Sequence, residues 1–148
     1  MHFSVLCFCD DSSLLRSVIV VGHSGCGGAK ASLAAAQNPS VSKDSSITTI
    51  PSLPRDAPLN RWLAPLTKLA TTLQLSGKPN EEAVPIVVEA NIKEQVDNIC
   101  KTQTMIGAWA SDDPKKKNIF VHGWLYDLAT GKLKDLGISR GPSVQHSG

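Results

Sequence analysis

A run rich in β-branched residues, Ser17-Val18-Ile19-Val20-Val21, constrains the fold of this chain more than any other feature, and it ends at Gly22. The run follows neither a period of 2 nor a period of 3.6, which is typical of a strand buried on both faces of a parallel sheet. A glycine-rich stretch comes next, and good helix formers then extend from Ala29 to Gln37. This order of strand, turn and helix predicts an α/β fold with a mainly parallel central sheet flanked by helices.

The rest of the chain predicts further helices and a C-terminal hairpin. After Pro58 the apolar residues recur at helical spacing, in a helix that Pro65 is expected to kink or split. The remaining pattern and turn residues predict a long loop at 38–56, helices within 80–101 and 104–110, and strands at 118–127 and 132–136 joined by a turn at 129–131.

Composition excludes several classes of protein. A chain of 148 residues with 41% hydrophobic and 19% charged residues is ordinary for a globular protein, and it contains no apolar run of membrane-spanning length. A net charge of +2 is too small to indicate a nucleic-acid-binding or membrane-binding surface. The start of the chain lacks the basic leader of a secretory signal, so we expect a cytoplasmic protein with reduced cysteines.

Two side chains with metal-binding chemistry follow the buried strand. His23 and Cys26 stand three positions apart within a stretch that also holds Gly22, Gly25 and Gly27. Open α/β sheets place their sites at the carboxyl ends of parallel strands, and imidazole nitrogen and thiolate sulfur are ligands that zinc prefers. The pair is therefore a candidate for half of a tetrahedral zinc site.

The same glycines also raise the possibility of phosphate binding, because a glycine-rich turn before a helix offers backbone N–H groups to an anion. The spacing argues against this reading. Gly28 and Ala29 stand where a phosphate-binding loop has Lys and then Ser or Thr.

The stretch from Val18 to Gly28 resembles the second zinc motif of the β-class carbonic anhydrases. Three later segments, 91–99, 108–110 and 122–133, resemble the C-terminal helices and final strands of that family in matching order. The resemblance extends from about residue 17 to residue 137. It implies one β-carbonic anhydrase-like domain at 17–137, a divergent or truncated segment at 1–16 and a flexible tail at 138–148.

The resemblance also implies an activity and a cofactor. Family members hold Zn²⁺ with two Cys and one His, keep water or hydroxide in the fourth position, and convert carbon dioxide and water to bicarbonate and a proton. Zinc lowers the pKa of its bound water from 15.7 to about 7, which supplies a nucleophile at neutral pH. His23 and Cys26 match two of the three ligands. By the same resemblance we expect a homodimer or a higher homo-oligomer.

The third ligand is not identified by the sequence. In the family it belongs to a Cys-x-Asp-Ser-Arg motif, whose Asp and Arg form a dyad beside the zinc water, and this chain lacks that motif. Cys9-Asp10-Asp11-Ser12-Ser13 is the nearest imitation. Only seven residues separate Cys9 from Ser17, too few for a crossover between parallel strands, and in an antiparallel hairpin Cys9 would lie about 17–20 Å from His23.

In the alternative alignment, 11–15 resembles the helix before the buried strand, so that the first strand of the family is missing. Residues 1–10 are then unrelated sequence, and a residue upstream of Met1 supplies the third ligand; under the first alignment Cys9 supplies it. The catalytic dyad is unassigned under both. Two hypotheses follow: a zinc-dependent carbonic anhydrase, or an inactive, incomplete relative that acts only as an assembly partner.

Other candidate residues are interpreted as structural. His122 lies within an alternating strand, and Cys7 and Cys100 are expected to be buried thiols. The aromatic residues are expected to serve in core or interface packing, as listed here: Trp62, Trp109, Trp124 and Tyr126.

Overall fold

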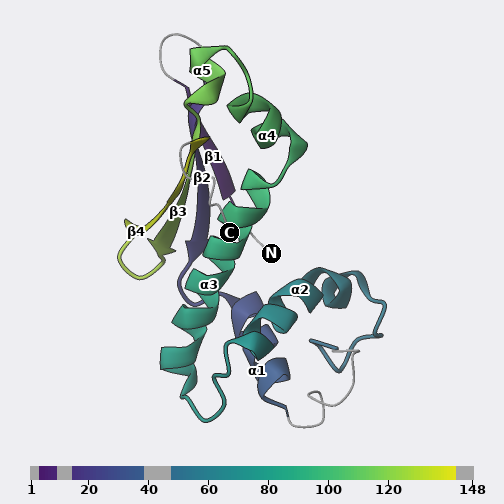
Figure 1. The fold of residues 1–148 in the computed structure, drawn as a ribbon. Helices are drawn as coiled ribbons and strands as arrows, with labels where there is room; N and C mark the ends of the chain where they lie inside the picture. Colours follow the sequence, from purple (N-terminus) through teal and green to yellow (C-terminus); the bar gives the residue numbers. More distant parts are fainter. Residues whose placement is uncertain (1–3, 10–14, 39–47, 143–148) are drawn as a thin grey trace. The chain divides into compact units, whose positions relative to one another are not determined.

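The computed structural model describes residues 4–9, 15–38 and 48–142 (Figure 1). In chain order the elements are β1 (Ser4–Cys9), β2 (Leu15–His23), α1 (Gly27–Gln37), α2 (Pro58–Thr72), α3 (Asn80–Cys100), α4 (Gln103–Trp109), α5 (Pro114–Lys117), β3 (Phe120–Asp127) and β4 (Lys132–Arg140). The described residues form two compact units. One extends from His23 to Asn91, and the other combines the residues up to Gly22 with those from Ile92 onward. The predicted single domain at 17–137 stays a prediction.

The strands form one four-stranded sheet in the order β1-β2-β3-β4, so β2 is a central strand as predicted. β1 pairs antiparallel with β2, from Ser4 opposite Val21 to Cys9 opposite Leu15, as expected for the hairpin alternative. β3 and β4 also pair antiparallel and form the predicted C-terminal hairpin. The predicted α/β class is confirmed. The sheet is mixed, with more antiparallel pairing than predicted, because each outer strand is joined to its neighbour by a short connection and runs antiparallel to it.

The sheet unit is built on the buried residues of β2 and on a close approach between α3 and β3. Val20 and Val121 are fully buried, as are Ile92 and Val96 on the C-terminal half of α3. A Cβ at Gly123 would lie 2.8 Å from Ile92 Cγ2 and 3.3 Å from Val96 Cγ2. The absence of a side chain at Gly123 therefore lets the helix lie directly on the strand.

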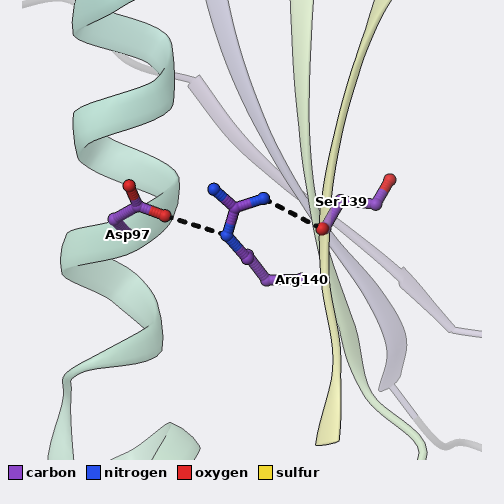
Figure 2. A network of polar contacts seen from close by, with 3 residues as sticks. All are labelled: Asp97, Ser139 and Arg140. Atoms are coloured by element: carbon purple, nitrogen blue, oxygen red, sulfur yellow. Dashed lines mark hydrogen bonds and ion pairs between the residues drawn. The ribbon is translucent and has the colours of Figure 1, made fainter. Parts of the chain in front are cut away.

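An ion pair adds a polar contact between the same helix and β4 (Figure 2). Arg140 Nε donates to Asp97 Oδ1 at 3.0 Å, and Arg140 Nη1 donates to the Ser139 carbonyl at 3.2 Å. Both charged side chains keep part of their surface exposed, so the pair contributes at most about 1 kcal/mol. Its effect is to fix the orientation of the Arg140 side chain rather than to hold the fold.

The helical unit packs α1 against α2 and ties a loop to α2. Leu33, Leu63 and Ala70 are buried in this unit. Asn60 is also buried; its Oδ1 accepts from the Ile50 N–H at 2.7 Å, and its Nδ2 donates to the Pro54 carbonyl at 2.9 Å. The segment 48–57 has no regular secondary structure, as predicted, while 39–47 lies outside the described residues.

The helix predictions are confirmed with one refinement. α2 extends without interruption through Pro65, so it is not split. α3 begins at Asn80 and includes Pro85 in its second turn, and α4 forms where a short helix was expected. Among the described residues, no helix is both long enough and apolar enough to cross a membrane.

We predict that Gly123→Ala lowers the free energy of unfolding by about 1–3 kcal/mol, because the new methyl group overlaps the side chains of α3. Urea denaturation measures the change. Gly107→Ala is the matched control, since a Cβ at Gly107 meets nothing within 4 Å and alanine favours the helix. Equal stability of Gly123→Ala and the wild type would contradict the close approach of α3 to β3.

A second prediction concerns Cys100, at the end of α3. Burial raises the pKa of its thiol above the ordinary value of 9.0, the Asp97 carboxylate raises it further, and Arg140 opposes the rise. Because the pKa is higher in the folded state, the associated stability is present below pH 9.0 and is lost as the pH rises through the folded pKa.

Asp97→Asn is therefore expected to lower the pKa of Cys100. The measurement is the pH dependence of Cys100 alkylation, followed by mass spectrometry, which should move to lower pH. Asp112→Asn serves as control and should leave the profile unchanged. A profile in Asp97→Asn that moves to higher pH would refute this account of the thiol.

Candidate metal centre

The two predicted donors lie on either side of one tight turn. β2 ends at His23, and Cys26 occupies the N-cap position of α1 with φ −57° and ψ 119°. The chain reverses through Gly25, whose φ of +65° is a conformation that residues with a Cβ rarely adopt. The first helical hydrogen bond follows at once, from Lys30 N–H to the Cys26 carbonyl at 3.0 Å. The strand and helix therefore present the imidazole and the thiol from neighbouring backbone positions.

A backbone hydrogen bond orients the imidazole. His23 Nδ1 lies 3.0 Å from the Ser24 carbonyl oxygen. A carbonyl oxygen can only accept, so the proton of this bond belongs to Nδ1, and the neutral ring keeps its free lone pair on Nε2. Metal-binding histidines commonly donate their second ring N–H to a carbonyl in this way. Nε2 is therefore the ligand atom that His23 offers.

The thiol of Cys26 lies close to Gly28 of α1. Cys26 is partly buried, forms no disulfide, and makes no side-chain capping bond to α1. A Cβ placed on Gly28 would lie 3.8 Å from Cys26 Sγ and 3.2 Å from Leu63 Cδ2. The space in front of Gly28 is thus bordered by the sulfur and by Leu63, and Gly28 and Leu63 form an apolar wall there. No sequence pattern identifies Leu63, which belongs to α2 and is separated from Cys26 by the whole of α1.

A complete ligand set is not found. Within the described part of the chain, no three His, Cys, Asp or Glu side chains gather as a metal-binding group. Cys9 pairs with Leu15 at the far end of the β1–β2 hairpin. Eight residues of β2, at about 3.4 Å each, place it about 27 Å from His23. Zinc–ligand bonds are about 2.0–2.3 Å, so one ion cannot join both residues.

The donors that are present fit zinc chemically. One imidazole nitrogen and one thiolate sulfur supply two positions of a tetrahedral site, and the other two positions need donors from elsewhere. His122 lies on β3, in the sheet unit, with its Nδ1 2.8 Å from Ser139 Oγ, and it belongs to no group of three potential ligands among the described residues. Asp10 and Asp11 lie outside the described residues.

Comparisons with known proteins point to one family. A family model described as carbonic anhydrase matches residues 3–133. Three solved β-carbonic anhydrases have similar folds. The Coccomyxa enzyme, determined with acetazolamide, is 27% identical with a TM-score of 0.63, and the match covers 82% of this chain and 47% of that one.

The other two are fungal proteins. A tetrameric enzyme from Sordaria macrospora is 23% identical with a TM-score of 0.60, and the match covers 85% of this chain and 54% of that one. CafA from Aspergillus fumigatus is 25% identical with a TM-score of 0.58, covering 86% of this chain and 51% of the other. The present chain thus spans about half the length of these solved proteins.

The wall beside Cys26 leads to a prediction. Gly28→Ala places a methyl group against Leu63 and the sulfur, so we expect a loss of about 1 kcal/mol in stability and a severalfold change in the alkylation rate of Cys26. Residue-resolved mass spectrometry of iodoacetamide labelling measures that rate. The neighbouring Gly27→Ala is the control, because a Cβ there meets nothing within 4 Å. Identical labelling of both variants would rule out a role for this wall.

Proposed function

Because this chain belongs to the carbonic anhydrase family, we propose that it takes part in the zinc-dependent, reversible hydration of carbon dioxide to bicarbonate and a proton. The observation that supports this most directly is the turn that presents His23 Nε2 and Cys26 Sγ from adjacent ends of β2 and α1. The family as a whole uses zinc, and these two donors suit that ion.

The residues of the turn have distinct roles in this proposal. His23 binds through Nε2 while Ser24 fixes the plane of its ring. Cys26 would hold the ion as the thiolate, since the thiolate is the ligand form of cysteine, and Gly28 leaves the space beside the sulfur without a side chain. Zinc, when bound, lowers the pKa of water to about 7 and so supplies hydroxide at neutral pH.

The third protein ligand and the catalytic dyad are proposed to lie outside the described residues. Cys9 is disfavoured by the register of the β1–β2 hairpin. The resemblance suggests a Cys-x-Asp-Ser-Arg sequence upstream of Met1, and the matched solved proteins are about twice as long as this chain. We also propose a homo-oligomer, supported by the tetrameric Sordaria relative, and a cytoplasmic location.

Zinc content and carbon dioxide hydration test the proposal together. We expect the purified chain to contain zinc, and His23→Ala and Cys26→Ser each to lose at least about nine-tenths of it, since removing one of few ligands weakens binding strongly. Elemental analysis measures the metal, and stopped-flow hydration assays measure the activity. His122→Ala and Cys100→Ser are matched controls that should retain both.

The second hypothesis predicts another result. An incomplete relative that acts only as an assembly partner would contain no zinc and hydrate no carbon dioxide. Its supporting observation is that no group of three potential metal ligands forms among the described residues. If neither the wild type nor the His23→Ala variant contains zinc, the assembly-partner hypothesis is supported and the zinc enzyme is refuted.

A further inference from the structure

A cavity of about 320 Å³ lies in the helical unit, beside the turn that carries the two donors. Its wall is formed by the N-terminal parts of α1 and α3, with these lining residues: Gly25, Lys30, Asn80, Glu81, Val84 and Pro85. Neither His23 nor Cys26 lines it. The cavity is therefore a separate feature, adjacent to the candidate metal centre but not part of it.

Two opposite charges face this cavity from different helices. Lys30 lies one turn into α1, where its N–H bonds to the Cys26 carbonyl, and Glu81 belongs to the first turn of α3. Neither side chain forms an ion pair or hydrogen bond with another described residue, and the two do not pair with each other. The Lys30 ammonium group and the Glu81 carboxylate both line the cavity but do not form an ion pair. A ligand could therefore bind between them and pair with each.

The remaining wall defines the shape of such a ligand. Val84 is nearly fully buried and forms an apolar surface with the rigid ring of Pro85. The Asn80 carboxamide can donate to an anion or accept from a cation. Gly25 has no side chain, and a Cβ there would meet nothing within 4 Å, so the cavity is open on that side.

We propose that this cavity binds a small zwitterion, an α-amino acid with an apolar side chain. The ligand's carboxylate pairs with Lys30, its ammonium group pairs with Glu81, and its side chain lies on Val84 and Pro85. A zwitterion can pair with both Lys30 and Glu81 at once. A simple anion would leave Glu81 without an opposite charge, and a simple cation would leave Lys30 without one. The proposal does not rest on zinc or on hydration activity.

NMR titration of the full-length chain with L-leucine tests the proposal. We expect shifts of the backbone amides of Gly25 and Val84, with saturable binding. Two analogues of leucine separate the contributions of its two charged groups to binding. 4-Methylpentanoate lacks only the amine, and 3-methylbutylamine lacks only the carboxylate. Each should bind about tenfold more weakly than leucine, because one charged hydrogen bond is lost.

Variants connect the binding to the two residues. Lys30→Met and Glu81→Gln should each weaken leucine binding about tenfold, and both positions are exposed on helices, so folding is retained. Glu82→Gln and Lys68→Met are the matched controls and should bind as the wild type does. If 4-methylpentanoate binds as tightly as leucine, or if Glu81→Gln leaves the affinity for leucine unchanged, the proposal of a zwitterion site is refuted.

Repeating the titration with His23→Ala separates this inference from the proposed function. We expect leucine to bind that variant as it binds the wild type, because His23 does not line the cavity. Loss of leucine binding on loss of His23 would overturn the assignment of an independent site. Loss of zinc alone would bear only on the hydration chemistry.

Discussion

The left-handed backbone at Gly25 is the constraint on which the candidate metal centre depends. It lets the chain leave β2 and enter α1 within three residues, so that His23 and Cys26 stand at the two ends of one tight turn. The hydrogen bond from His23 to the Ser24 carbonyl forms inside the same turn, and the cavity lined by Lys30 and Glu81 opens against Gly25. Gly25 thus belongs both to the turn of the candidate metal centre and to the wall of the cavity.

Much of the fold could be predicted from local patterns. The β-branched run predicted β2, and the apolar periodicity predicted α2 and α3. The alternation before Ala129 predicted β3 and its hairpin. The resemblance to β-carbonic anhydrases is confirmed by the family match over residues 3–133. These features can be predicted from the sequence because periodicity and turn residues determine structure over short stretches of chain.

Contacts between distant segments were not predictable in the same way. No sequence pattern near Gly28 predicts that Leu63 lies against it, and none near Gly123 predicts its close approach to Ile92. The pairing of β1 was open between two alternatives until its register placed Cys9 away from His23. No group of three potential metal ligands forms among the described residues, and local sequence pattern does not identify a third zinc ligand.

The buried carboxamide of Asn60 has a consequence for the segment that precedes α2. By bonding to Ile50 and Pro54, it anchors the chain just before α2, and the hydroxyls of Thr49 and Thr67 meet at 2.7 Å in the same unit. Loss of this carboxamide removes the partners of the Ile50 N–H and the Pro54 carbonyl, so one side chain of α2 holds both ends of the segment 50–54.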